Sequence, residues 1–186
     1  MDHPVPATIE TARLVLAAPV AADTEPIFHR YASDPEVTRY VGWPRHRSLD
    51  DTRAFLAFSD AQWARWPAGP YLIRSREDGR LVGGTGLAFD APDEAMTGYV
   101  LARDAWGHGF ATEVLGAMVD LARALGVRRL YALCHPDHRA SWRVLEKCGF
   151  ARERGSPRTE FPNLAPGVLQ DVLCYARLLR VVVPAD

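Results

Sequence analysis

The sequence predicts an α/β (α+β) protein with a mixed, mostly antiparallel sheet of six to seven strands, flanked by about four helices. Two observations predict this class. Three strand-like segments between residues 70 and 101 are separated by turn signals, which indicates an antiparallel meander. A long amphipathic helix follows, and the strand directly after it requires a crossover and therefore pairs in parallel. We expect one domain over residues 1–186, with its core at about 8–180.

Composition restricts the class of protein further. The chain has 186 residues, 48% of them hydrophobic, and a formal net charge of −1, which is typical of a globular protein with a sizeable core. Its arginines are scattered among acids, so no basic stripe for nucleic acid is present. No apolar run could span a bilayer, residues 1–10 lack the features of a signal peptide, and three cysteines make no disulfide framework. We expect a cytoplasmic protein that binds neither nucleic acid nor membrane.

The first third of the chain predicts one strand and several helices. Residues 11–17 (TARLVLA) alternate leucines and indicate the first strand. Asp23 can cap a helix that follows it, and Asp34 with the proline after it can start a second short turn of helix. Ser48 can cap a longer helix, rich in aromatic residues, that runs to Trp66.

The remaining elements follow from alternation, helical periodicity and turn residues. Glu77-Asp78-Gly79 is a hairpin turn signal between the first two strands of the meander, and residues 90–94 make its second turn. The expected strands are residues 70–76, 80–89, 96–101, 129–134, 151–155 and 170–179, the expected short helix is residues 138–148, and residues 156–167 are an expected connection.

Residues 106–125 (WGHGFATEVLGAMVDLARAL) combine a glycine-containing loop with the start of the amphipathic helix. The first N–H groups of a helix lack intrahelical partners, and the helix dipole adds partial positive charge there. Glycines let a ligand approach the backbone closely. The arrangement suits a phosphate or pyrophosphate, although an ordinary strand–helix connection can also use glycine.

Two common phosphate loops fit this stretch poorly. A P-loop ends in Gly-Lys-Ser/Thr, but Gly109 is followed by Phe110 and Ala111. The dinucleotide-binding fingerprint requires a third glycine at the position that Thr112 holds.

The segment from Trp106 to Ala111 resembles the acetyl-CoA pyrophosphate loop of the GNAT superfamily of N-acetyltransferases, Gln/Arg-x-x-Gly-x-Gly/Ala, although Trp106 departs from the first position. WGHGFATE is especially similar to the RimJ/RimL branch, the ribosomal-protein N-terminal acetyltransferases, and TARLVL resembles the opening of that branch. The resemblance implies the GNAT fold and acetyl-CoA as co-substrate, with no metal. The loop residues that it implies for cofactor binding are Trp106, Gly107, His108, Gly109, Phe110, Ala111 and Thr112.

A second segment, residues 135–150 (HPDHRASWRVLEKCGF), resembles the branch pattern Asn-x-x-Ser-x-x-Leu/Val-x-x-Lys-x-Gly-Phe. His138 stands where the family has an asparagine that bonds the pantetheine arm of coenzyme A, so the resemblance implies that His138 takes this place. Arg139 and Arg143 could reach the adenosine phosphates, or they are solvated helix residues. A metal site at the nearby cysteines and histidines lacks a second half of ligands.

Acetyl transfer to an amine requires a held thioester, a deprotonated amine, a donor for the oxyanion and a proton for the leaving thiolate. By resemblance, the pantetheine arm pairs with the end of strand 96–101, and a backbone N–H near Val100 or Leu101 receives the oxyanion. Ser141 is the candidate acid for the thiolate, unless it only helps to hold the helix start. The candidate base is Glu94, because Met96 stands where the branch often has its glutamate.

An α-amine has a pKa near 8 and is partly neutral at pH 7, unlike lysine near 10.4. A site without an obvious base therefore suits an α-amine or another weakly basic acceptor. The sequence predicts an N-acetyltransferase that acts by direct attack in a ternary complex on a small-molecule amine or a protein N-terminus. By resemblance, residues 41–66 form one wall of the acceptor cleft. Relatives are often dimers, so the resemblance also allows a homodimer. The alternatives are a non-catalytic acyl-CoA-binding protein and a nucleotide-binding regulator.

Overall fold

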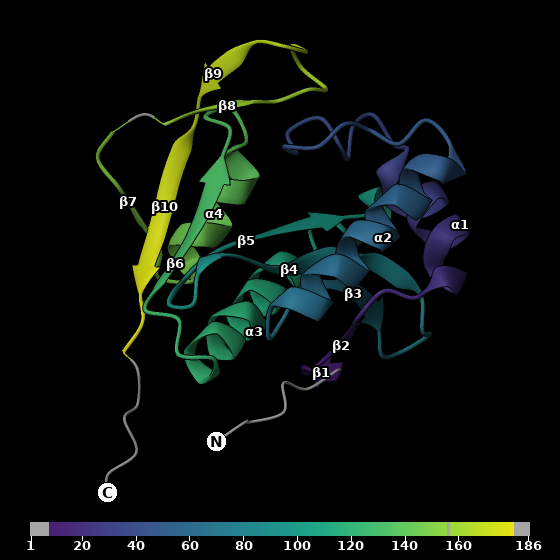
Figure 1. Ribbon diagram of the computed structural model, residues 1–186, viewed down its shortest axis with the longest axis horizontal. Coiled ribbons are helices and arrows are strands. Elements are labelled where there is room, and N and C mark those ends of the chain that lie inside the picture. The colour runs from purple at the N-terminus through teal and green to yellow at the C-terminus, as the bar shows by residue number, and fades with distance from the viewer. Residues whose placement is uncertain (1–7, 156, 181–186) are drawn as a thin grey trace, which may run out of the picture.

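The protein is described by a computed structural model that covers residues 8–155 and 157–180, so residues 1–7, where most of the segment without signal-peptide features lies, are outside it. One large sheet dominates the arrangement in Figure 1. The strands and α-helices in chain order are β1 (Thr8–Glu10), β2 (Leu14–Ala17), α1 (Thr24–Ile27), α2 (Leu49–Arg65), β3 (Pro70–Ser75), β4 (Leu81–Ala91), β5 (Glu94–Leu101), α3 (Phe110–Ala124), β6 (Arg129–Cys134), α4 (Arg139–Lys147), β7 (Ala151–Arg152), β8 (Arg158–Glu160), β9 (Leu169–Asp171) and β10 (Leu173–Leu178). Short 3-10 turns precede α1 (Ala21–Asp23) and follow β5 (Arg103–Ala105), and a π-helical turn (Phe28–Ala32) continues α1.

The large sheet has eight strands in the order β1-β2-β3-β4-β5-β6-β10-β7, in place of the expected six to seven. All neighbouring pairs are antiparallel except β5 and β6, which are parallel. The predicted fold class, including the crossover between the strands on either side of the long helix, is therefore confirmed. A second sheet pairs β8 with β9. β8 lies in the expected connection, and β9 takes the start of the expected strand 170–179, the rest of which is β10.

The N-terminal segment differs from the expected single strand over residues 11–17. Residues 11–13 form a turn, in which Thr11 N donates to Leu14 O at 2.9 Å, so only residues 14–17 of this stretch are strand. This strand, β2, pairs antiparallel with β1, which precedes the expected strand. The turn of helix expected at Asp34 is a single turn, in which Thr38 N donates to Asp34 O at 3.0 Å, and no helix continues from it. Ser48 begins α2 as expected, because the Asp51 carboxylate accepts a bond from Ser48 N at 3.1 Å.

The two faces of the sheet carry two separate hydrophobic cores, because successive side chains of a strand point to opposite faces. Tyr71 and Ile73 of β3 lie in the larger core, which α3 fills with its predicted apolar face. Leu72, between them, lies in the smaller core with Ile27 and Leu56 of α1 and α2. The sheet is therefore covered on both faces, by α3 on one and by α1 and α2 on the other.

The strands β5 and β6 separate halfway along β5. Pairing between them covers only residues 94–96 of β5, whereas β4 pairs with β5 as far as Leu101. Figure 1 shows β4 and β5 running away from β6 and β10 beyond this point. The β6-side backbone edge of residues 97–101 is consequently left without a strand partner. From this open edge the chain passes through one short 3-10 turn, Arg103–Ala105, to the loop before α3.

Candidate active site

The loop before α3 has the conformation that its glycines allow. Gly107 and Gly109 both have φ of +78°, in the left-handed region where other residues are strained. Gly109 immediately precedes the first helical residue, Phe110, and residues 106–109 are exposed. A Cβ placed on Gly107 would meet no atom within 4 Å. Residues 106–112, which we call the glycine loop, thus present the start of α3 to open space.

Trp106 closes the end of β5 instead of pointing into the glycine loop. Its indole N–H donates to the carbonyl oxygen of Leu101 at 2.8 Å, although the side chain remains 47% exposed.

The backbone N–H groups at the end of β5 point alternately toward β4 and toward the open edge. Ala102 N donates to Val82 O at 2.8 Å, so it faces β4. Because strand backbone groups alternate in direction, the N–H of Val100 also faces β4, whereas the N–H of Leu101 faces the open edge. Of the two predicted oxyanion donors, the structure therefore orients Leu101 toward the open edge.

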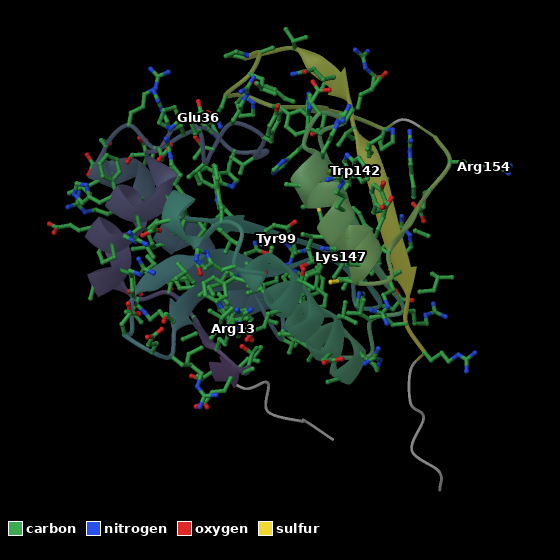
Figure 2. All side chains as sticks on the ribbon, turned by 180° about the vertical axis from the view of Figure 1, so that it is seen from behind. Arg13, Glu36, Tyr99, Trp142, Lys147 and Arg154 are labelled. Atoms are coloured by element: carbon green, nitrogen blue, oxygen red, sulfur yellow. The ribbon has the colours of Figure 1, made fainter. Side chains whose placement is uncertain are left out.

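Ser141 lies in the first turn of α4, opposite the open half of β5. Its N–H donates to His138 O at 3.0 Å, and its hydroxyl oxygen accepts a bond from the Tyr99 hydroxyl at 3.3 Å. Burial raises the pKa of Tyr99 to about 12, so this phenol stays protonated at neutral pH and acts as a donor. Figure 2 shows Tyr99 of β5 beside α4. The structure thus places one hydroxyl pair where β5 and β6 separate.

Tyr99 is a site residue that sequence reasoning missed, since the strand was considered only for its backbone. Cys134 at the end of β6 adjoins the same place, and burial raises the pKa of its thiol although contact with Ser141 opposes that shift. The available signal was alternation: Tyr99 lies on the strand face opposite to Gly98 and Val100, toward α4.

His138 immediately precedes α4 and stacks on the ring of Tyr40, with ring centroids 4.8 Å apart. The other histidine of this corner, His135, stacks on Tyr40 at 4.9 Å. Burial, with a further contribution from His135, lowers the pKa of His138, so its ring is neutral at pH 7. The structure brings His138 next to Ser141, with one ring nitrogen available as a donor and the other as an acceptor.

Arg143 lies apart from this group. Its guanidinium is 5.7 Å from the ring of Trp142, and both side chains line a cavity of about 740 Å³ between α4 and β10. Ser141 does not line this cavity, and Cys148, one turn beyond Val144, contacts Thr112 of α3 instead. The structure therefore does not bring Arg143 to the glycine loop, because its position on α4 turns it toward β10.

Glu94 is also separated from Ser141. Strand β5 begins two residues earlier than expected, so Glu94 is its first residue and forms an ion pair with Arg129, which also binds Glu153. Tyr99, the partner of Ser141, is five residues along the strand, or roughly 16 Å at the rise of an extended chain. Glu94 is consequently at the closed end of β5, too far from Ser141 to act in the same site.

Two segments about 120 residues apart in sequence meet beside the open edge and are joined by Asn163. Its side-chain oxygen accepts a bond from Arg45 N at 2.8 Å, and its amide nitrogen donates to Thr38 O at 2.7 Å and Trp43 O at 2.9 Å. Phe161 packs edge-on against His135 at 4.8 Å. We name residues 33–48 together with residues 158–171 the acceptor wall, after the role proposed for them below; of the expected wall, residues 41–66, this set contains only residues 41–48. No local sequence pattern marks Asn163, whose partners are all distant backbone groups.

Within the part of the chain that the structure describes, no three histidine, cysteine, aspartate or glutamate side chains gather as metal ligands. No helix among the described residues has the length and apolar character needed to cross a membrane.

The comparisons with known proteins agree with this architecture. Residues 13–151 match the acetyltransferase (GNAT) domain family. The chain is 33% identical over 148 residues to the uncharacterized N-acetyltransferase YoaA of Bacillus subtilis, covering 78% of this chain and 83% of that protein.

Solved structures of acetyltransferases share the fold. One is RimL, the ribosomal L7/L12 alpha-N-protein acetyltransferase in complex with coenzyme A, with a TM-score of 0.79 and 24% identity over 94% of this chain and 97% of that one. Another is the microcin C7 self-immunity acetyltransferase MccE in complex with acetyl-CoA and AMP, with a TM-score of 0.82 and 19% identity over 96% of this chain and 100% of that one. The chain belongs to the GNAT acetyltransferases and is an N-acetyltransferase.

Proposed function

We propose that this N-acetyltransferase binds acetyl-CoA along the open edge of β5 and transfers the acetyl group to a primary amine by direct attack in a ternary complex. The observation that carries the proposal is the continuity of two features: the unpaired edge of residues 97–101 and the glycine loop that follows it. An unpaired strand edge can pair with the amides of a pantetheine arm. The amides from Gly107 to Ala111 can then receive the pyrophosphate. Coenzyme A and acetyl-CoA in RimL and MccE support this choice of co-substrate.

The chain supplies an oxyanion donor and a proton donor in this proposal. The Leu101 N–H stabilises the carbonyl oxygen as the amine nitrogen attacks the thioester carbon. The carbon–sulfur bond then breaks, the electron pair leaves with sulfur, and the Ser141 hydroxyl gives the thiolate its proton. Because Tyr99 donates to Ser141 Oγ, the Ser141 hydroxyl does not need its own hydrogen for this bond and can turn it toward the thiolate. Solvent takes the proton of the amine and restores that of Ser141.

We propose no protein base. Glu94 lies at the other end of β5 in its ion pair with Arg129. Burial lowers the pKa of His138, whose ring is stacked on Tyr40, and so makes this ring a weak base. An acceptor that is already partly neutral at pH 7 makes the smallest demand on such a site. The acceptor class is therefore a weakly basic primary amine, such as a protein N-terminal α-amine or a small-molecule amine, which reaches the site along the acceptor wall. RimL, whose name gives an alpha-N-protein acetyltransferase, supports this class.

The branch, the compartment and the domain organisation are part of the same proposal. The TARLVL opening and WGHGFATE support membership of the RimJ/RimL branch. We propose that residues 1–186 form one domain that works in the cytoplasm, alone or as a homodimer.

A thiol-release assay with acetyl-CoA and a panel of amines tests the function. The panel contains peptides with free N-termini, their N-acetylated controls, spermidine, and free amino acids. We expect thiol release with at least one free amine and none with the blocked peptides, together with an acceptor that gains 42 Da by mass spectrometry, as one acetyl group requires. If coenzyme A binds but no amine of the panel supports thiol release, the alternative of a non-catalytic acyl-CoA-binding protein replaces the proposal.

A further inference from the structure

We propose that Arg13 is a positioning residue for the cofactor. Its positive charge compensates the Glu113 carboxylate at the start of α3, and its contacts fix the glycine loop so that the loop can receive the pyrophosphate. This inference rests on the proposed function. It gives a role to the TARLVL opening, which has none in the transfer itself. The structure shows that this opening and WGHGFATE, about 100 residues apart, are in direct contact.

The contact is made by a dense set of hydrogen bonds to one carboxylate. Thr11 Oγ1 donates to Glu113 Oε1 at 2.6 Å, and Arg13 N donates to the same oxygen at 2.8 Å. The guanidinium of Arg13 holds the other oxygen, Oε2, through Nε and Nη2, each at 2.7 Å. Both oxygens of Glu113 are therefore occupied, and its side chain is only 15% exposed.

Glu113 needs this neutralisation because of where it lies. A carboxylate in the first turn of a helix stabilises the helix, but the same charge would repel a pyrophosphate at the helix start. Burial opposes its ionisation, yet hydrogen bonds from Thr11 and Arg13 hold the pKa of Glu113 below its usual value. The carboxylate thus stays charged at neutral pH, and Arg13 provides the compensating charge.

Arg13 also contacts the glycine loop itself. Its Nη1 donates to His108 O at 2.8 Å, and its guanidinium lies 4.7 Å from the centre of the Phe110 ring. The His108 ring stacks on Phe110 with centroids 5.8 Å apart. Arg13 Nη2 is also the atom nearest to a Cβ placed on Gly109, at 3.6 Å. One side chain therefore holds the carbonyl and the ring on either side of Gly109.

This geometry fits a positioning residue better than a simple brace between β2 and α3. A brace would need only Thr11 and the backbone N–H of Arg13, which already hold Glu113. The guanidinium adds the contacts to His108 and Phe110 and the charge that offsets Glu113. Removing only the guanidinium charge should therefore change the affinity for a pyrophosphate-bearing ligand more than it changes folding.

The test compares coenzyme A with pantetheine, which lacks the pyrophosphate, in titrations of Arg13→Gln, Glu113→Gln and the double variant. We expect Arg13→Gln to weaken coenzyme A binding about tenfold, since the Glu113 charge is then uncompensated near the phosphates. Pantetheine binding should stay within twofold of the parent. The double variant should regain most of the lost affinity, because the repelling charge is gone. Arg76→Gln is the matched control, since Arg76 binds Thr11 O at 2.7 Å on the same turn and should leave binding unchanged.

Two results would overturn the inference: parental coenzyme A affinity in Arg13→Gln, or a double variant that binds more weakly than Arg13→Gln. If Arg13→Gln does not fold, Arg13→Lys serves instead. Lysine keeps the positive charge but lacks the several N–H donors of the guanidinium, so we expect an intermediate loss of coenzyme A affinity. Parental affinity in Arg13→Lys would contradict the role of the contacts to the glycine loop. Failure of the parent to bind coenzyme A is a different outcome, which removes the proposed function itself.

Discussion

The cofactor side and the acceptor side of this protein are constructed differently. The open edge of β5, the glycine loop and α3 belong to one continuous segment, residues 94–124. Thr11, Arg13 and Cys148 reach its helix from outside through hydrogen bonds. The acceptor wall joins two separate segments through the three hydrogen bonds of Asn163 and the ring contacts of His135. The difference suggests that cofactor recognition depends on local backbone conformation, whereas acceptor recognition depends on long-range contacts that can vary without disturbing the cofactor.

Of the substitutions that test this difference, Gly109→Val on the cofactor side should have the largest effect, which is on coenzyme A affinity. A non-glycine residue at φ +78° carries strain of about 1–3 kcal/mol, and the branched side chain would crowd Arg13, whose Nη2 lies 3.6 Å from the Cβ position. We expect coenzyme A affinity to fall by more than about 100-fold, equivalent to ~2.8 kcal/mol, in calorimetric titration.

Gly126→Val is the matched control, because Gly126 has φ +79° at the other end of α3. It should lose similar stability but keep its affinity for coenzyme A. Equal affinities of parent and folded Gly109→Val would remove the glycine loop from the cofactor site.

Ser141→Ala tests the chemistry between the two sides. The change removes only a hydroxyl, so α4 should tolerate it. We expect kcat to fall by about 10²-fold, at the low end for proton donation because water can also stabilise a partly exposed thiolate. Acetyl-CoA affinity should change little, the pattern of an interaction made mainly in the transition state.

Tyr99→Phe should lower kcat less, and adding it to Ser141→Ala should cost nothing more, because Tyr99 acts through Ser141. Unchanged kcat in Ser141→Ala, measured where chemistry is rate-limiting, would reduce Ser141 to a helix-start residue.

Asn163→Ala tests the acceptor side. The substitution leaves the backbone groups of Thr38, Trp43 and Arg45 without their partner, at a cost of about 1–3 kcal/mol in unfolding free energy. With the acceptor wall loosened, we expect the acceptor KM to rise about tenfold while acetyl-CoA affinity is unchanged. Asn163→Asp keeps the acceptor for Arg45 N but loses both donors, so its effect should be intermediate. A parallel loss of acetyl-CoA affinity would show that the two sides are not independent.

The smallest expected effect concerns His138, which lies where the two sides meet. His138→Asn should keep acetyl-CoA affinity, and His138→Ala should weaken it about fivefold, as expected for the loss of about one hydrogen bond. Equal affinities in all three proteins would exclude His138 from the cofactor site.

Stability against pH gives a second measurement on His138. Its pKa is lowered in the folded protein, so the unfolded chain binds the proton more readily as the pH falls below about 6.5. The unfolding free energy should therefore decrease from pH 6.5 downward, and less steeply in His138→Asn. A slope unchanged by that substitution would contradict the buried, neutral ring.

The sequence predicted the parts of the fold and site that depend on local pattern. The apolar face of α3 and the parallel crossover follow from helical periodicity and the order of the elements, and both are present. The β8–β9 arm was not predictable, because strands of three residues are too short to show alternation.

Among the site residues, too, the features that depend on contacts between distant segments could not be predicted from the sequence. Alternation does not mark the residue at which a strand begins, so Glu94 was expected in a turn and is instead paired at the closed end of β5. Helical periodicity identifies residues on a common face but not which neighbour that face contacts, and Arg143 turned out to face β10. Asn163 acts only on backbone groups about 120 residues away, which no sequence spacing reveals.

Backbone amide hydrogen exchange with and without coenzyme A tests the central claim most directly. The account predicts that coenzyme A slows exchange at Tyr99, at Leu101 and in residues 107–111, because the open edge and the helix start gain hydrogen-bond partners. It predicts no change at residues 38–46 of the acceptor wall. Unchanged exchange at residues 99–111, or protection instead around the cavity that Arg143 lines between α4 and β10, would contradict the account.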